Sequence, residues 1–229
     1  MEFSSPEPAD FVNVQSLNHA FLNYLRRPGS GKRLRQQLPP TLEQLLAGIT
    51  DLQIRRLAKT PFLLFSLRES DDAYWRGLFG EDKTADLFTP MQSLSDEAGQ
   101  LVAATLGYLW QLSKHNSYAV RVASGASLNW CEQLRDCTLL YLLRRAAGRS
   151  DLLMLRLADK EELWRKLLGA GISSEHDIRV AAQHCALQTM LTDAQGTAYQ
   201  RLPAAACRTR LPSLQVAEGS NPPLRRKKL

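Results

Sequence analysis

Five basic side chains around a short loop near the N-terminus are the residues best suited to chemistry in this chain. The loop is Pro28-Gly29-Ser30-Gly31, and its neighbours are Arg26, Arg27, Lys32, Arg33 and Arg35. Such a cluster can neutralise phosphate groups, which predicts a salt-dependent contact with DNA. The alternative is a solvated charged face, and the sequence leaves both interpretations open.

The same loop can be compared with a nucleotide phosphate-binding loop, because a glycine precedes Lys32. That motif requires glycine where Arg26 stands and serine or threonine where Arg33 stands. No strand-like run of residues precedes the loop either. The sequence therefore predicts a flexible basic loop here rather than a nucleotide site.

Two further groups of cations lie elsewhere in the chain. Arg55, Arg56 and Lys59 fall on a predicted short helix and are further candidates for DNA contact. The C-terminal Arg225-Arg226-Lys227-Lys228 predicts a tail that adds non-specific electrostatic affinity. The chain has 29 Lys and Arg against 23 Asp and Glu, so the folded body is only mildly basic once the tail is set aside.

The titratable residues form no recognisable catalytic or metal-binding pattern. The four histidines lack HExxH spacing, and the four cysteines form no CxxC pair. Acidic pairs such as Asp71-Asp72 stand at predicted helix starts, where the helix dipole accounts for them. We therefore expect no enzyme activity, no metal, no cofactor, and thiols that are reduced and mainly buried.

The four tryptophans divide into two groups. Trp75 and Trp164 stand at equivalent places in two similar stretches, which favours a packing role. Trp110 and Trp130 are less constrained by the pattern, and an exposed one would be a candidate anchor for a protein partner.

These side chains must be positioned by helices, because leucine dominates the apolar residues and β-branched residues are sparse. The prediction of the helices starts from the stretch 48–68. Thr50 is a helix cap for a short helix, because its hydroxyl can accept a bond from a first-turn N–H group. Thr60-Pro61 then predicts a second helix, which would be buried because Phe62, Leu63, Leu64, Phe65 and Leu67 follow.

The same order of features occurs again at 125–144. Ser127 takes the place of Thr50, and Leu139, Leu140 and Leu142 take the places of Phe62, Leu63 and Phe65. Upstream, Leu22, Tyr24 and Leu25 recur as Leu106, Tyr108 and Leu109; downstream, the segment 74–78 with Trp75 recurs as 163–167 with Trp164. This order predicts a diverged internal repeat.

The stretch also resembles the flagellar master-regulator subunit FlhD. The similarity runs without gaps through Leu46, Ile49-Thr50, Gln53, Leu57-Ala58, Thr60, Leu63 and Arg68. The resemblance implies an all-α transcription regulator that works with a second, FlhC-like subunit; related activators occur on conjugative mobile elements. The chain differs from that family in being about twice as long. It also has Phe65 where the family can carry a dimer-linking cysteine, so a disulfide-linked dimer is not implied.

The expected fold is all-α, with two diverged helical repeats packed as an intramolecular pseudo-dimer. We expect a disordered lead over 1–12, a first helical unit over 13–88, a second over 89–192, and an extended or disordered basic tail over 193–229. No apolar run reaches the roughly 18 residues of a membrane span, and the N-terminus lacks a signal pattern. We therefore expect a soluble, cytoplasmic protein.

The predicted function is that of a transcription regulator or co-activator subunit that acts with a partner protein on DNA. It would be monomeric in isolation, or part of a larger hetero-complex. The alternative is an all-helical adaptor or structural subunit of a larger assembly, such as a secretion or conjugation machine. The adaptor interpretation predicts exposed apolar or tryptophan patches, and no DNA affinity beyond that of the tail.

Overall fold

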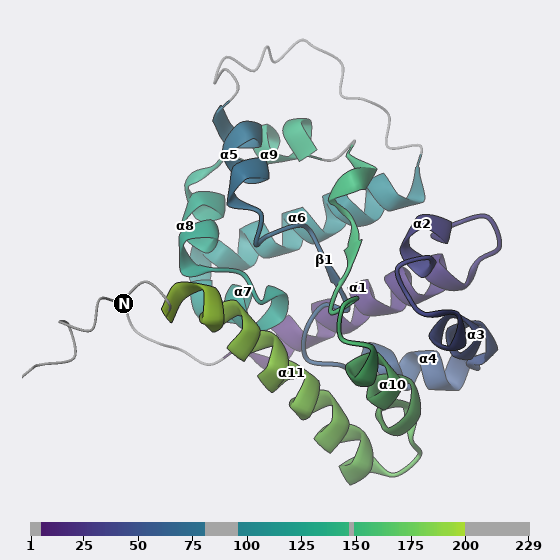
Figure 1. The fold of residues 1–229 in the computed structure, drawn as a ribbon. Coiled ribbons are helices and arrows are strands. Elements are labelled where there is room, and N and C mark those ends of the chain that lie inside the picture. Colours follow the sequence, from purple (N-terminus) through teal and green to yellow (C-terminus); the bar gives the residue numbers. More distant parts are fainter. Residues whose placement is uncertain (1–5, 81–95, 147–148, 200–229) are drawn as a thin grey trace, which may run out of the picture.

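The structure is a computed structural model that describes residues 6–80, 96–146 and 149–199 (Figure 1). The first half (residues 6–80) contains α1 (Pro8–Arg26), α2 (Lys32–Arg35), α3 (Pro40–Gly48), α4 (Asp51–Ala58), β1 (Phe65–Ser66) and α5 (Asp72–Gly80). The second half (residues 96–199) contains α6 (Glu97–His115), α7 (Ser117–Ser124), α8 (Leu128–Asp136), α9 (Leu139–Ala146), η1 (Ser150–Leu152), β2 (Met154–Leu155), α10 (Glu161–Gly169), η2 (Ala170–Ile172) and α11 (His176–Tyr199).

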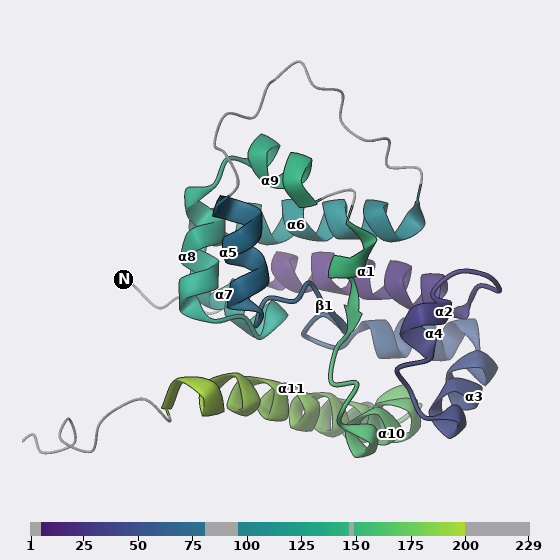
Figure 2. The same ribbon diagram turned by 45° about the horizontal axis from the view of Figure 1, so that its top comes forward.

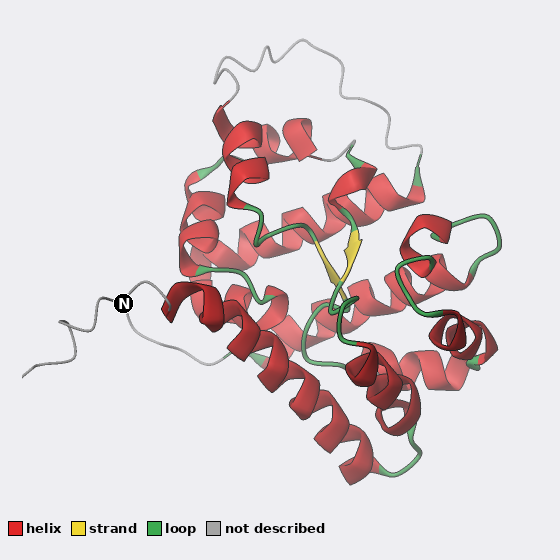
Figure 3. Cartoon of the chain, in the orientation of Figure 1, coloured by secondary structure: helices red, strands yellow, loops and turns green. Residues whose placement is uncertain are grey.

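The chain is mostly helical, which confirms the all-α class (Figure 3). The sheet in the described part is one antiparallel pair of two-residue strands, β1 and β2. No helix in the described ranges has the length and apolar character needed to cross a membrane. The predicted boundary at 88/89, Cys207 and the basic C-terminal residues lie outside the described residues.

Helices α1 and α6 form the centre of the molecule, with α11 on the other side of α1 from α6 (Figure 2). α1 buries Val14, Asn18, Phe21, Leu22 and Leu25. The buried residues of α6 include five with the same spacing, Ala98, Val102, Thr105, Leu106 and Leu109. This spacing places one apolar stripe on each helix. Because one core cluster includes residues of both halves, the halves are joined by a continuous apolar interior.

Two helices begin at the predicted caps. The Thr50 hydroxyl accepts a hydrogen bond from the Gln53 N–H at 3.3 Å, and the Gln53 side chain accepts one from the Thr50 N–H at 2.8 Å. The Ser127 hydroxyl accepts one from the Trp130 N–H at 3.2 Å and begins α8. Both caps are therefore confirmed.

The predicted second helix after Thr60-Pro61 is wrong. Residues 60–64 are not helical and lead into β1, although Phe62 to Phe65 are all buried as expected. The Thr60 hydroxyl does not cap a new helix, because it donates to the Leu57 carbonyl at 2.6 Å. The stretch 139–146, which the repeat had matched to this segment, is helical, so these two segments differ in structure.

A buried side chain from α1 explains the extended path. The Asn18 Nδ2 donates to the carbonyls of Phe62 at 2.8 Å, Thr60 at 3.3 Å and Ala58 at 3.4 Å. The Asn18 Oδ1 accepts from the Leu64 N–H at 2.8 Å. These bonds satisfy backbone groups that would otherwise be buried without partners, so the segment does not need helical hydrogen bonds.

The strands β1 and β2 enter similar turns. A non-glycine residue with positive φ follows each strand, Arg68 at 55° and Leu157 at 56°. A helix carrying a buried tryptophan comes next in each half, α5 with Trp75 and α10 with Trp164. The prediction that these two tryptophans pack in the interior is confirmed.

Two predicted boundaries need correction. α1 begins at Pro8, inside the segment 1–12 predicted as a disordered lead, because Glu7 and Asp10 form a capping box and Pro8 takes the first helical position. α11 continues to Tyr199, beyond the predicted start of the tail at 193. The start of α5 agrees with the predicted helix start at Asp71-Asp72, since the Asp71 carboxylate accepts from the Tyr74 N–H at 3.0 Å.

Candidate functional site

The arginines of the basic loop 26–35 already have partners within the protein, most of them at its surface. Arg26 forms an ion pair with Asp51 at 2.7 Å, Arg27 pairs with Glu97, and Arg35 lies 3.5 Å from Glu43. Because each cation already has a carboxylate partner, the positive charge that the loop can offer to a phosphate is smaller than the sequence indicates.

Arg33 and Arg35 also bind backbone carbonyls. Arg35 donates to the carbonyls of Ser30 at 2.7 Å and Arg27 at 3.2 Å, and it also reaches the Leu25 carbonyl. Arg33 donates to the carbonyl of Asp151 at 3.3 Å. Arg35 thereby shapes the loop 28–31, and Arg33 connects α2 to the second half.

Three of the eight predicted phosphate-binding residues remain available. Lys32, Arg55 and Lys59 are exposed, and their side chains form no ion pair or hydrogen bond with other described residues. Arg56 is different, since its Nη1 donates to the Ile172 carbonyl at 3.3 Å. Among the eight predicted residues, Lys32, Arg55 and Lys59 are therefore the ones whose side chains are free to contact DNA phosphates.

The two tryptophans proposed as partner anchors lie inside the fold. Trp130 is buried, and its ring packs edge-on against Trp75 with centroids 5.3 Å apart. Trp110 is partly buried, its Nε1 donates to the Cys137 carbonyl at 2.8 Å, and Lys114 covers its ring at 4.9 Å. The anchor role requires an exposed ring, and Trp130 does not meet that condition.

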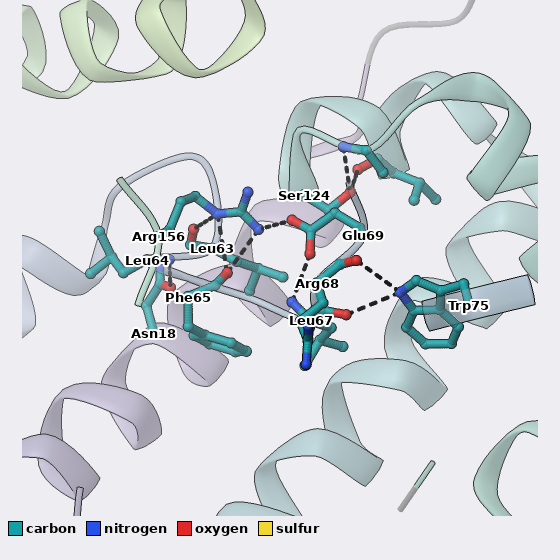
Figure 4. A network of polar contacts seen from close by, with 12 residues as sticks. Asn18, Leu63, Leu64, Phe65, Leu67, Arg68, Glu69, Trp75, Ser124 and Arg156 are labelled. Atoms are coloured by element: carbon teal, nitrogen blue, oxygen red, sulfur yellow. Dashed lines mark hydrogen bonds and ion pairs between the residues drawn. The ribbon is translucent and has the colours of Figure 1, made fainter. Parts of the chain in front are cut away.

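A buried polar network connects the two halves, and it was missed by the sequence interpretation (Figure 4). The Arg156 Nε donates to the carbonyl of Leu63 at 2.6 Å, and its Nη2 donates to that of Phe65 at 2.8 Å. The same guanidinium forms an ion pair with Glu69, with side-chain exposures of 9% and 5% for the two partners. The Glu69 carboxylate also accepts from the Leu67 N–H at 2.6 Å.

This network satisfies both buried charges, as a buried ion pair requires. Its sequence signal is a single arginine within the apolar run 152–157, where a surface strand would alternate polar and apolar residues. The network contains no nucleophile and base in contact, so its chemistry is that of a structural connection.

The cysteines and histidines are the candidates for a metal site, and the cysteines are the candidates for reactive thiols. Within residues 6–80, 96–146 and 149–199, no group of three or more His, Cys, Asp or Glu side chains could hold a metal ion. Burial raises the pKa of the Cys131 thiol to about 12 and also raises the pKa of Cys137. Both thiols are thus protonated at neutral pH, while Cys185 is exposed.

A shallow groove of about 510 Å³ lies between the two halves, where α3 and α4 approach α10 and η2. Its lining residues are Thr41, Gln44, Leu45, Gly48, Ile49, Gln53, Leu168 and Ile172. Leu45 is 51% exposed, and Leu52 on α4 is 58% exposed. These leucines form an apolar surface that the protein's own core does not cover.

Comparison of the chain with protein-family models, curated proteins and solved structures finds no match. The inference of function therefore rests on the geometry described above and on the local resemblance of residues 46–68.

Proposed function

We propose that this chain is an FlhD-like transcription regulator subunit in which two related helical units form a pseudo-dimer within one chain. The regulator part of the proposal is supported by the local resemblance of residues 46–68, and the register of β1 and β2 is the observation that supports the two-unit part. When Trp75 is aligned with Trp164, Phe65 becomes the counterpart of Met154, and Ser66 that of Leu155. The observed pairs are Phe65 with Leu155 and Ser66 with Met154. Phe65 thus pairs with the counterpart of Ser66, and Ser66 pairs with the counterpart of Phe65. A two-fold axis between the two strands requires this exchange.

Further parallels support two related units. The indole of Trp75 donates to the Leu67 carbonyl, and that of Trp164 donates to the Arg156 carbonyl, eight residues earlier in both cases. The positive-φ residues Arg68 and Leu157 lie at matching positions. The strand, turn and tryptophan helix of one half therefore have counterparts in the other.

The pseudo-dimer arrangement has a consequence for assembly. A unit that would otherwise pair with a second copy finds its partner within the same chain. We expect a monomer of 25.7 kDa in dilute solution, and light scattering measures this mass directly. In function, the monomer would act in the cytoplasm with a second regulator subunit.

An experiment can separate DNA contact by the folded body from DNA contact by the basic C-terminal tail. Binding of a generic duplex is measured at two salt concentrations with the unchanged chain and with a variant in which Arg225, Arg226, Lys227 and Lys228 are replaced by glutamine. Binding by the neutralised variant at low salt supports a phosphate-contacting folded body. Loss of all binding would leave the tail as the only DNA contact and contradict the proposal.

The exposed leucines favour a second candidate function, an adaptor or structural subunit of a larger assembly. Leu45 and Leu52 present apolar surface that suits contact with another protein. The adaptor function predicts that no DNA affinity remains once the tail is neutralised. The DNA experiment thus distinguishes the two candidates.

A further inference from the structure

The Arg156–Glu69 ion pair joins the two halves at their centre. All of the hydrogen bonds from the Arg156 guanidinium that lie within the described residues go to the first half, to the carbonyls of Leu63 and Phe65 and to the Glu69 carboxylate. The Arg156 main chain is also fixed, since its N–H donates to the Leu64 carbonyl at 3.2 Å and its carbonyl accepts from Trp164. The pair is therefore an ordered part of the contact between the halves (Figure 4).

The two units do not share this ion pair. In the alignment of Trp75 with Trp164, the counterpart of Arg156 is Leu67, and the counterpart of Glu69 is Ala158. Leu67 is buried, so the position is an interior one in both units. A contact that is otherwise two-fold in pattern thus carries a positive charge from one unit and a negative charge from the other.

This asymmetry discriminates between possible pairings. If two first units from separate chains paired, two Glu69 carboxylates would be buried opposite Leu67 side chains. If two second units paired, two Arg156 guanidinium groups would be buried opposite Ala158. Both arrangements bury charges without an opposite charge beside them, which is strongly unfavourable, whereas the pairing of unlike units gives each charge an opposite partner.

We propose that the Arg156–Glu69 ion pair is the specificity element that makes the first unit pair with the second and excludes pairing of like units between two copies of this chain. The proposal rests on the two-unit arrangement of the proposed function. It assigns to the pair a role in the choice of partner, in addition to its hydrogen bonds within the fold.

A doubly neutral variant tests this role. In the full chain with Glu69→Gln and Arg156→Gln, the charges are absent while both side chains can still form hydrogen bonds. Equal amounts of light-isotope and heavy-isotope chains are mixed, unfolded in urea, refolded together at high concentration and chemically cross-linked. Mass spectrometry then counts light–heavy links between like halves and light–heavy links between unlike halves.

We expect the ratio of like-half to unlike-half links to rise about tenfold in the neutral variant relative to the unchanged chain, because the barrier to like pairing is gone. Chains that merely exchange halves give unlike-half links and do not raise this ratio. An unchanged ratio in a folded neutral variant would overturn the proposal.

A second variant tests the proposal by stability, in case the neutral variant does not fold. Glu69→Ala with Arg156→Leu gives each position the residue of its counterpart, and its urea midpoint is compared with those of the two single variants. We expect the double variant to be more stable than either single one, because each single variant leaves a buried charge without an opposite charge beside it. A double variant less stable than both would show that the pair serves packing alone, and would overturn the proposal.

If the unchanged chain is already a dimer by light scattering, the intramolecular pseudo-dimer itself fails, which is a separate result.

Discussion

The indoles of Trp75 and Trp164 make the same backbone contact in the two halves of the protein. Each Nε1 donates to the carbonyl of the residue eight positions before it, Leu67 at 3.2 Å and Arg156 at 2.8 Å. Trp75 also donates to the Arg68 carbonyl at 3.0 Å. These bonds connect α5 and α10 to the turns that follow β1 and β2. The two tryptophans therefore make the same kind of helix-to-turn contact in the two halves.

Replacing Trp75 or Trp164 by phenylalanine removes the donor and leaves a buried carbonyl without its partner. We expect each change to lower the free energy of unfolding by about 1–3 kcal/mol, in addition to the loss of packing volume. Trp130→Phe is the matched control, because the buried Trp130 Nε1 has no hydrogen-bond partner among the described residues. Urea unfolding gives the free energy of unfolding of all three variants. Equal losses for Trp130 and Trp75 would show that the indole–carbonyl bonds contribute little.

Asn18→Leu should be among the more damaging single substitutions in α1. It removes the side chain that satisfies the Phe62 carbonyl and the Leu64 N–H, both in a buried segment. We expect the free energy of unfolding to fall by about 2–4 kcal/mol, since several backbone groups lose their partners together. The exposed Asn13→Leu on the same helix should stay within about 0.5 kcal/mol of the unchanged protein. Similar effects at the two positions would contradict the role assigned to Asn18.

The comparison of Thr50 with Phe62 shows which parts of the fold the sequence could predict. The Thr50 cap depends on a bond to Gln53, three residues away, and such local bonds follow from residue type and spacing. The burial of Phe62 was also predictable from its apolar neighbours. Its extended conformation was not, because it depends on Asn18, which is 44 positions earlier in the chain. Apolar runs do not distinguish a buried helix from a buried extended segment without such distant contacts.

The candidate site was harder to predict for the same reason. Arg27 looked available for phosphate, but its partner Glu97 is 70 positions away in the chain. The ion pair of Arg156 with Glu69 likewise joins residues 87 positions apart. Charge clusters in a sequence indicate how many cations are present. Which of them are already paired depends on how the two halves pack.

The buried thiol of Cys131 makes a prediction about pH. Burial raises its pKa to about 12 from the ordinary value of 9.0, so the folded protein holds this proton more tightly than the unfolded chain. The resulting contribution to the free energy of unfolding is fully present below pH 9 and is lost as pH rises toward 12. The limiting slope of this loss is about 1.4 kcal/mol per pH unit. Urea unfolding between pH 8 and 10.5 should show a steeper decline for the unchanged protein than for Cys131→Ala. Parallel declines would indicate that the thiol is free to ionise in the folded state.

The salt dependence of DNA binding by the folded body tests the proposed regulator function most directly. The chain with its four C-terminal cations neutralised is compared with the same chain carrying Lys32→Gln, Arg55→Gln and Lys59→Gln. Arg165→Gln is the control, since Arg165 already lies 3.2 Å from Glu162 in an ion pair. We predict duplex binding by the tail-neutralised chain, and a salt slope that falls by about one for each lost phosphate contact when the three exposed cations are removed. Absence of binding by the tail-neutralised chain would contradict DNA contact by the folded body. Binding with a salt slope that does not change when Lys32, Arg55 and Lys59 are replaced would contradict the assignment of that contact to these three residues.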